Sequence, residues 1–345
     1  MNRRKESTAK ARIVDCGLRG VNPKSEIRNP KWAYVSRFTF HVLLFLICGS
    51  TISHANTGGA GGAFLQLGGG ARACGMGGAY TAVADDIYSL HWNPGGLNHL
   101  TRTEVAASYR FMSLDRRCFF SGIAQPLEPG GGYALGWLYA GTEVDRRDIN
   151  GNITGRMSDS ENAFYFAFAR ELPLPLPASL GLTMKYLYQT LADQSAKGLG
   201  FDLGLQLQLP GNFRMGCVIK DIGTHLSWKT NLWERETASE DDVPSGIVGG
   251  LSWRALSNRL LVAADASKSC DLEADVRLGA EFVAHPMLSI RGGVNHLLEA
   301  ELRSFSAGFD IRTLVTPGFF RFGYAYVTDP IGAGNSHVGS VMMGF

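Results

Sequence analysis

Hydrophobic and polar residues alternate strictly along several stretches of the chain. In residues 201–209, Phe and Leu occupy every second position, and Asp, Gly and Gln lie between them. The same period of two runs through residues 272–282 and 320–326. A period of two places successive side chains on opposite faces of a strand, and about ten such residues cross a bilayer at a tilt. These stretches therefore predict long strands with one apolar and one polar face.

Fourteen strand-like segments follow one another along the chain. Their expected bounds are 102–111, 117–127, 131–141, 161–171, 178–190, 198–209, 212–221, 245–254, 258–268, 272–283, 286–296, 303–311, 317–327 and 336–345. The connections after even segments are short, whereas the two longest, 142–160 and 222–244, follow odd segments and are polar and charged. An even strand number, short periplasmic turns and long extracellular loops are typical of bacterial outer-membrane barrels.

The polar faces of these segments carry many charges. They include Lys185, Asp202, Asp265, Arg277, Glu281, Arg291 and Arg321. In a dry core each unpaired charge would cost several kcal/mol, but in a wet or plugged lumen the cost is small. The sequence therefore predicts an all-β fold, a 14-stranded antiparallel transmembrane β-barrel, rather than a soluble β-protein.

The longest apolar run, residues 38–47, is too short to span a membrane as a helix. Basic residues precede it, and Ser53-His54-Ala55 follows with the small-x-small pattern of a cleavage site. A core helix is the alternative, but the flanks favour a signal peptide cut after Ala55. The expected organisation is a signal peptide with a long basic n-region (1–55), an N-terminal hatch or plug (56–100) and the barrel (101–345).

The net charge and the cysteine spacing limit which ligands and partners the chain could bind. The formal charge is +2, but ten basic and three acidic residues precede Phe38, and without them the charge is −5. A nucleic-acid partner therefore has no electrostatic support. Cys74, Cys118, Cys217 and Cys270 form no CxxC pair and no zinc-like spacing, so we interpret them as buried or lipid-facing thiols, with a disulfide left open.

A glycine-rich stretch, residues 58–78, precedes the first strand. Glycines allow close backbone approach and positive φ. We expect a short helix over Ala79–Ala84 and a turn at Asn93-Pro94. Such a segment can plug a barrel that is too wide for side chains alone to fill.

The segment 67–100 resembles the N-terminal part of the PorV/PorQ family, within the wider FadL-like outer-membrane group. The resemblance rests on Gly70-Ala71-Arg72, Gly75-Met76-Gly77-Gly78-Ala79, Ala84-Asp85-Asp86 and Trp92-Asn93-Pro94. It implies a lumenal hatch with Gly70, Arg72, Gly75, Gly77, Gly78, Asp85 and Asp86 as its motif. It also implies gating at Asn93, Pro94 and Gly95, although Gly95 departs from the Asn-Pro-Ala sequence of FadL-like hatches.

The chain ends on an alternating strand whose positions Val341, Met343 and Phe345 form one apolar stripe. A terminal aromatic residue there resembles the signal that the outer-membrane insertion machinery reads. An ordinary terminal strand is the alternative.

Other chemistry finds little support. The glycines at 68–78 lack the Gly-Lys-Ser/Thr of a phosphate loop. Asp85, Asp86 and His91 could be imagined as metal ligands, but we expect the two aspartates to cap or end a short helix and His91 to face solvent. We therefore expect no cofactor, no metal and no catalytic residues.

Two functions remain open for an outer-membrane barrel of this type. One is a FadL-like conduit for fatty-acid-like hydrophobic molecules, which would bind in the lumen and pass when the hatch shifts. The other is a PorV-like partner or shuttle that holds a secreted protein or joins a surface-assembly system. A general diffusion pore ranks third, because a hatch would block it.

Overall fold

A computed structural model describes residues 61–345 except 193, 233–234, 270–273, 330–331 and 333. The expected signal peptide, its cleavage site and Cys270 lie outside the described residues. Fifteen strands are present in the described part. Fourteen of them close an antiparallel barrel, and β8 pairs with the outer part of β7 alone. The predicted 14-stranded antiparallel barrel is confirmed.

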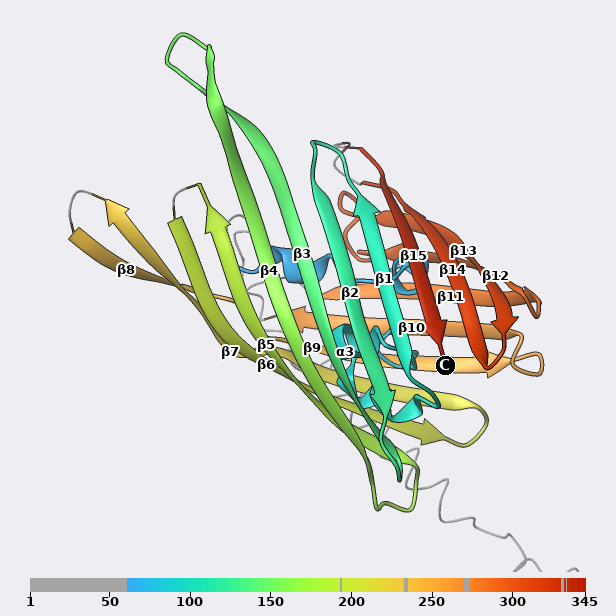
Figure 1. Cartoon of the computed structure of the whole chain (residues 1–345). Helices are drawn as coiled ribbons and strands as arrows, with labels where there is room; N and C mark the ends of the chain where they lie inside the picture. The colour runs from blue at the N-terminus through green and yellow to red at the C-terminus, as the bar shows by residue number, and fades with distance from the viewer. Residues whose placement is uncertain (1–60, 193, 233–234, 270–273, 330–331, 333) are drawn as a thin grey trace, which may run out of the picture. The chain divides into compact units, whose positions relative to one another are not determined.

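The strands run in chain order around the barrel (Figure 1). Their bounds are β1 Glu104–Phe111, β2 Arg117–Pro126, β3 Gly131–Arg147, β4 Ile153–Leu172, β5 Ala178–Leu191, β6 Gln194–Leu209, β7 Phe213–Leu232, β8 Arg235–Asp242, β9 Gly246–Ala255, β10 Leu260–Ser269, β11 Asp275–His285, β12 Leu288–Asn295, β13 Ser304–Val315, β14 Gly318–Val327 and β15 Ser336–Gly344.

The barrel closes between its first and last strands. Glu104 pairs with Gly344, and the register continues to Phe111 opposite His337. Elsewhere β7 pairs with β9 over residues 213–220 and with β8 over residues 225–232. Short turns connect the strands at the end of the barrel where β15 finishes; we call it the short-turn end, and the opposite one the long-hairpin end.

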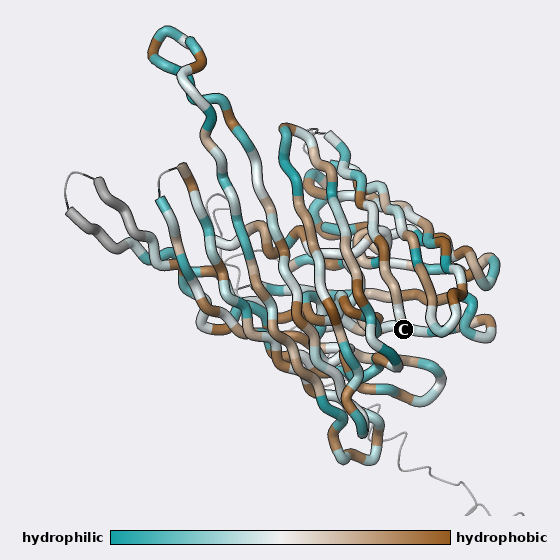
Figure 2. Tube along the Cα trace, viewed as in Figure 1, coloured by the Kyte–Doolittle hydropathy of each residue, from teal (hydrophilic) through white to brown (hydrophobic). Residues whose placement is uncertain are grey.

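The alternating pattern places apolar side chains on the outer face. In β4, Phe164, Phe166 and Phe168 are 40–46% exposed, whereas Tyr165 and Ala167 between them are at most 3% exposed. Figure 2 shows hydrophobic and hydrophilic positions following one another along the strands. An outward stripe of phenylalanines is stable in lipid, since apolar side chains have no reason to leave a hydrocarbon solvent.

The prediction that 142–160 and 222–244 are loops is wrong, because most of these residues lie in strands. β3 runs to Arg147 and β4 starts at Ile153, so only five residues connect them. Most of the second stretch likewise forms a hairpin of β7 and β8, and both hairpins extend beyond the rest of the barrel (Figure 1). Beyond the bilayer the ladder hydrogen bonds persist without an apolar face, so polar residues continue the strands that hydrophobic alternation predicts to end.

Inside the barrel lies the inner segment, which we define as residues 61–100. It contains η1 (Ala63–Gln66), α2 (Ala71–Gly75), α3 (Ser89–Trp92) and η2 (Pro94–His99). Among the described residues, no helix is long and apolar enough to cross a membrane.

The helix expected over Ala79–Ala84 is wrong, because the chain makes a turn there. The Val83 N–H donates to the Tyr80 carbonyl at 3.0 Å. The N–H groups of Tyr80 and Thr81 donate instead to the Asp265 carboxylate of β10, at 2.9 and 2.8 Å. A barrel side chain 184 residues away therefore decides the local backbone, which propensity could not foresee.

The described cysteines are free thiols. Cys74 and Cys118 are buried, and Cys217 is half-buried. The interpretation as buried or lipid-facing thiols is confirmed for these three.

Candidate functional site

The inner segment fills the lumen and contacts the barrel wall through glycines. A Cβ atom on Gly204 would overlap the Asn93 side chain, and one on Gly216 would overlap the Thr81 backbone. Four further wall glycines meet inner-segment backbone in the same way: Gly132, Gly181, Gly279 and Gly293. Glycine has no Cβ, so these positions let the two backbones approach more closely than any other residue would.

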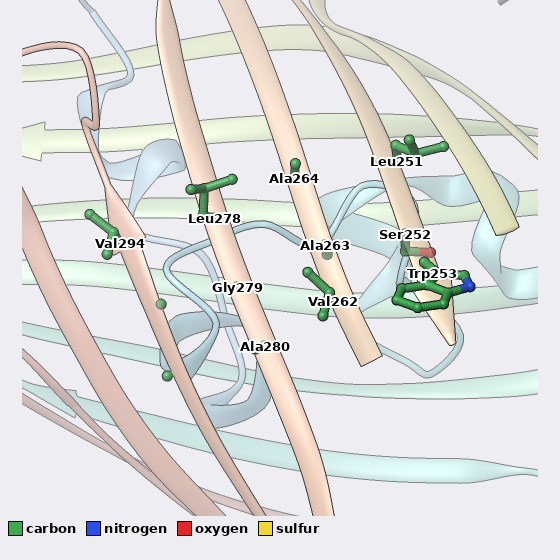
Figure 3. Close-up of a pocket in the computed structure, with 12 residues that line it drawn as sticks. Leu251, Ser252, Trp253, Val262, Ala263, Ala264, Leu278, Gly279, Ala280 and Val294 are labelled. Carbon is green, nitrogen blue, oxygen red and sulfur yellow. The ribbon is translucent and has the colours of Figure 1, made fainter. Parts of the chain in front are cut away.

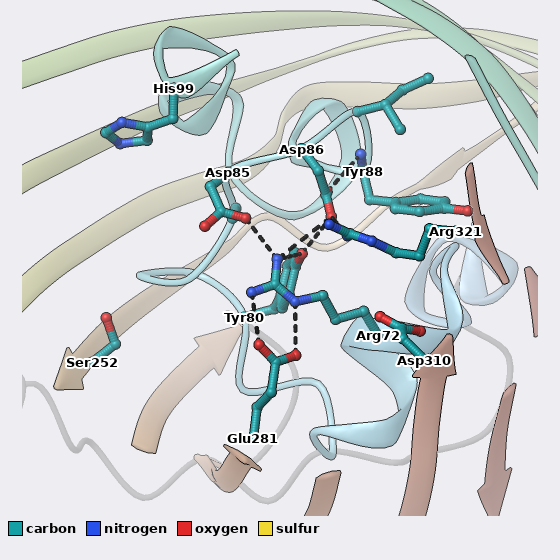
Figure 4. A network of polar contacts seen from close by, with 12 residues as sticks. Arg72, Tyr80, Asp85, Asp86, Tyr88, His99, Ser252, Glu281, Asp310 and Arg321 are labelled. Atoms are coloured by element: carbon teal, nitrogen blue, oxygen red, sulfur yellow. Dashed lines mark hydrogen bonds and ion pairs between the residues drawn. The ribbon is translucent and has the colours of Figure 1, made fainter. Parts of the chain in front are cut away.

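A network of buried charges ties the inner segment to the wall (Figure 4). Arg72 of α2 donates from Nε to Glu281 Oε2 at 2.9 Å and from Nη2 to Oε1 at 3.1 Å. Its third nitrogen reaches Asp85 Oδ1 at 2.6 Å and the Tyr80 hydroxyl at 3.0 Å. Such a bidentate arginine–carboxylate pair fixes orientation as well as distance.

The network continues along the wall beyond Glu281. Arg291 of β12 donates to Glu281 at 3.2 Å and to Asp310 Oδ1 of β13 at 2.9 Å. Breaking a buried pair by removing one partner costs about 3–5 kcal/mol, because the other charge stays buried and unpaired. The inner segment is therefore held by interactions that are expensive to break one at a time.

Asp85 does not cap or end a helix as expected, whereas Asp86 Oδ1 accepts from the Tyr88 N–H at 3.1 Å in the turn that leads into α3. Asp85 also accepts from Arg254 of β9 at 3.0 Å. Burial alone would raise the pKa of Asp85, but Arg72 and the other guanidinium groups outweigh it and hold the pKa below its ordinary range. Asp86 Oδ2 accepts from the Tyr80 hydroxyl at 2.8 Å, and burial raises the pKa of that carboxyl.

The predicted gating triplet lies between the inner segment and β5–β6. Asn93 Nδ2 donates to the carbonyls of Thr81 at 2.8 Å and Leu205 at 3.1 Å, and its Oδ1 accepts from Gly95 N–H at 3.1 Å. Pro94 packs over Gly181. A Cβ on Gly95 would lie only 3.1 Å from the Gln206 nitrogen. The departure from Asn-Pro-Ala thus has a steric reason, since β6 passes too close for an alanine to fit without a shift.

The other glycines of the predicted hatch motif also lie at close contacts with neighbouring residues. A Cβ on Gly70 would overlap the Tyr88 ring, and one on Gly75 would overlap the Arg291 side chain. Gly77, with φ +64°, lies on the Val294 backbone, and Gly78 has φ +76°. Arg72, Asp85 and Asp86 of the predicted motif therefore meet in one network, and three of its glycines lie where the inner segment contacts its own Tyr88 ring or the barrel wall.

His91 is buried at 5% exposure, so the expectation that it faces solvent is wrong. Its Nδ1 lies 3.2 Å from the Tyr165 hydroxyl. Burial, assisted by the charges of Lys220 and Lys185, holds the pKa of His91 well below its ordinary value. A neutral histidine between aromatic rings fills space here, and the structure separates it from the two aspartates, which bind arginines.

A second ionic cluster lies on the wall beside His91. Lys185 of β5 pairs with Asp202 of β6 at 2.7 Å and with Asp221 of β7. Lys220 lies over the Trp92 ring at 5.4 Å. Lys185 and Asp202, two of the charges predicted to face a wet or plugged lumen, are therefore paired beside the inner segment.

Sequence reasoning missed several members of these clusters. They are Tyr80, Tyr165, Asp221, Arg254 and Asp310. Asp310 and Arg254 could have been predicted to face the lumen, because each alternates with the apolar, outward-facing residues of its strand. The C-terminal residues Val341, Met343 and Phe345 lie elsewhere, exposed at 41–59% on the outer face.

On the outer face, β9–β12 form an apolar hollow of about 440 Å³ (Figure 3). Leu251, Trp253, Val262 and Leu278 line it and are 40–44% exposed. The wall is thin here, since small residues occupy both of its faces in neighbouring strands. They are Ala263 and Ala264, Gly279 and Ala280, and Gly292 and Gly293.

No protein-family model matches the chain, and no curated protein sequence matches it. Among solved structures, the chain is similar to the toluene transporter TbuX of Ralstonia pickettii, with a TM-score of 0.58 and 13% identity. That match covers 80% of this chain and 97% of TbuX. The monoaromatic hydrocarbon channel CymD matches with a TM-score of 0.56 and 14% identity over 81% of this chain and 97% of its own.

A FadL homologue of Pseudomonas aeruginosa matches with a TM-score of 0.52 and 9% identity, covering 78% of this chain and 96% of its own. At these identities the comparisons show the fold alone. The chain therefore shares the barrel fold of these solved structures, although its sequence has little in common with theirs.

Proposed function

We propose that the chain is an outer-membrane channel for small hydrophobic molecules, with the inner segment as a hatch that closes it. The observation that carries the proposal is the lumen filled by residues 61–100 and held there by buried polar bonds. Similar barrels are described as a toluene transporter and a monoaromatic hydrocarbon channel. A plugged barrel is unsuited to free diffusion, so passage requires the inner segment to move. The proposal involves no catalytic step.

The lumen offers an apolar surface toward the long-hairpin end. Leu138, Leu187 and Leu226 are fully buried on the inward faces of β3, β5 and β7. Phe64 and Leu65 of η1 belong to the same hydrophobic cluster. A hydrophobic molecule entering from that end would compete with the inner segment for this apolar surface, so its binding energy is available to loosen the inner segment.

A disulfide that locks the inner segment to the wall tests this proposal. Ser252 Oγ of β9 donates to the Ala82 carbonyl at 3.3 Å, which places this turn of the inner segment beside β9, and an Ala82→Cys, Ser252→Cys pair is first checked for bridge formation by mass spectrometry. Cys217 and Cys270 would be replaced by serine in all variants. Uptake of radiolabelled toluene would be measured in Gram-negative cells that lack their own hydrocarbon channel. We expect oxidised cells to lose uptake and reduced cells to regain it.

The matched control places a disulfide where it restrains only the wall. Val144 and Met157 are cross-strand partners in the β3–β4 hairpin. A Val144→Cys, Met157→Cys pair is expected to leave uptake unchanged in either redox state. Full uptake with the Ala82–Ser252 bridge formed would show that the segment does not move. No uptake by the unmodified chain would refute the channel function itself.

The PorV-like alternative stays a prediction. The β3–β4 and β7–β8 hairpins offer a surface on which a secreted protein could dock, and a pull-down from culture medium with the β7–β8 hairpin deleted would test it. We likewise keep as proposals the removal of residues 1–55 and the reading of Val341, Met343 and Phe345 by the insertion machinery.

A further inference from the structure

A row of aromatic side chains crosses the outer face of β2–β5 toward the long-hairpin end. The rings of Phe119, Trp137, Phe164 and Tyr186 follow one another from strand to strand, with centroids 5.6, 6.3 and 6.4 Å apart. Trp137 Nε1 donates to Asn162 Oδ1 at 3.0 Å, on the side of the long hairpins. Aromatic rings with polar tips gather where hydrocarbon meets water. The row therefore marks the level at which the outer face leaves the apolar part of the membrane.

A polar hollow of about 570 Å³ lies next to this row, at β1–β4 and below the tip of the β3–β4 hairpin (Figure 1). Tyr109 and Phe111 of β1 form its apolar side, with their ring centroids 4.4 Å apart. Tyr109 is the cross-strand partner of Phe119, and Phe111 is that of Arg117, so these side chains share the outer face. The charged side of the hollow consists of Asp115, Arg116, Arg117, Glu143, Asp145 and Arg156. The hollow therefore opens to the surroundings of the barrel and not to its lumen.

The arginines of the hollow are not matched one to one by carboxylates. Arg117 Nη2 donates to Glu143 Oε1 at 2.9 Å, and Arg156 Nη1 lies 3.6 Å from the other oxygen of the same carboxylate. The Arg156 side chain is 76% exposed, and Arg116 lies 4.0 Å from Asp329. A guanidinium group carries several N–H donors in a planar fork. The three arginines therefore keep donors that these pairs do not use.

The hollow and its rim carry net positive charge. Arg147 pairs with Asp145 at 3.7 Å on the rim. Four arginines thus stand against three acids, namely Arg116, Arg117, Arg147 and Arg156 against Asp115, Glu143 and Asp145. This excess favours an anionic ligand, and the fork of arginine binds phosphate with two parallel hydrogen bonds.

The position of the hollow favours a lipid over a dissolved anion. Phe111 is 61% exposed beside the arginines. A free anion would leave this ring in water, whereas a lipid headgroup covers it and continues past Tyr109 into the membrane. Long hairpins lie on the outside of bacterial barrels, where the outer leaflet consists of a glycolipid with phosphates on its sugars. The membrane itself therefore supplies a phosphate at this level.

We propose that this hollow binds a phosphate of the outer-leaflet glycolipid, with Arg116, Arg117 and Arg156 around the phosphate and the rest of the lipid along Phe111 and Tyr109. The inference goes beyond the proposed channel, because the site lies outside the lumen and takes a resident lipid. It requires the barrel to lie in an outer membrane with its long hairpins outside. A bound lipid joins the β1–β2 turn to the β3–β4 hairpin and holds both at the membrane surface.

The test titrates the full barrel, in detergent and free of co-purified lipid, with lipid A and with lipid A from which both phosphates have been removed. Lipid A is the diphosphorylated, acylated disaccharide of the outer leaflet, and native mass spectrometry counts the bound copies. The variants are Arg116→Gln, which leaves the pairs of Glu143 intact, and the double variant Arg117→Gln, Arg156→Gln. Arg170→Gln is the matched control, because Arg170 is an exposed arginine at the other end of β4.

We expect lipid A to bind the unmodified chain and Arg170→Gln with Kd values within about twofold of each other. A hydrogen bond to a charged group contributes about tenfold in affinity. Arg116→Gln should therefore raise the Kd for lipid A about tenfold, and the double variant should raise it further. Dephosphorylated lipid A should bind the unmodified chain about tenfold more weakly than lipid A, and the variants should change its Kd less than about twofold.

Four results would overturn the proposed lipid site. Lipid A could bind both variants as tightly as the unmodified chain, or bind equally well with and without its phosphates. Inorganic phosphate that displaces lipid A at the same concentration would reveal a site for a free anion. Phosphatidylglycerol that binds as tightly as lipid A would reveal a surface for any anionic lipid. None of these results bears on transport, because the hollow lies outside the lumen.

Discussion

Two neighbouring glycines of β12, Gly292 and Gly293, make opposite predictions for the same substitution. A Cβ on Gly293 would overlap the backbone of Met76 and Gly77, which cannot rotate away. A Cβ on Gly292 faces the outer hollow and has a single neighbour, the Ser306 carbonyl, at 3.7 Å. Gly293→Val therefore drives a side chain into the inner segment, and Gly292→Val adds one to the lipid face.

The magnitude follows from the packing. Overfilling a tightly packed contact costs about 1–3 kcal/mol. Met76 is fully buried, so its expulsion from this contact would cost about a further 1.5–3 kcal/mol. Against a typical total stability of about 5–15 kcal/mol, this is enough to loosen the inner segment locally without unfolding the barrel. Gly292→Val is expected to stay within about 0.5 kcal/mol of the unmodified chain.

Two measurements separate these variants. Urea unfolding in liposomes reports the free energy of unfolding, and conductance in planar bilayers reports whether the lumen is open. We expect Gly293→Val to be less stable and to conduct ions, whereas Gly292→Val does neither. Equal behaviour of the two variants would mean that the inner segment does not rest on the wall at Met76, and the plug described above would be refuted.

The polar contacts give three further predictions. Glu281→Gln should lower the free energy of unfolding by about 3–5 kcal/mol, because it leaves the buried charge of Arg72 without its bidentate partner. A change below about 1 kcal/mol would mean that the ionic network does not hold the inner segment in place. Asn93→Ala should cost about 1–3 kcal/mol by the same urea assay, since it removes the two hydrogen bonds that the amide donates, and the Thr81 carbonyl then keeps only the Gln206 side chain as a donor. Burial lowers the pKa of His99 to about 4, so the folded chain resists protonation of this imidazole, and the stability that is full above about pH 6.5 should fall as the pH drops toward 4. His99→Gln should make the urea midpoint depend less on pH between these values. An unchanged pH dependence would contradict the lowered pKa of His99.

The sequence by itself determined the barrel. Period-two alternation is a local property, because each residue faces the side opposite to its neighbours whatever the rest of the chain does. The apolar face could therefore be read directly, as at Phe201, Leu203 and Leu205, and the outward positions of these strands are confirmed. The strand ends within 142–160 and 222–244 were not predicted, because strands outside the bilayer keep their ladder hydrogen bonds without alternating apolar residues.

The motif of the inner segment was visible in the sequence, but its chemistry was not. Arg72 and Glu281 are 209 residues apart, and only the closed barrel brings them within 2.9 Å. The same holds for Asp265, which fixes the turn at Tyr80 in place of the expected helix. Wall glycines such as Gly204 read in the sequence as ordinary polar-face positions. Local patterns decide which face a side chain occupies, whereas the partner it meets there depends on strands that pair far apart in the chain, and that is decided by the tertiary structure alone.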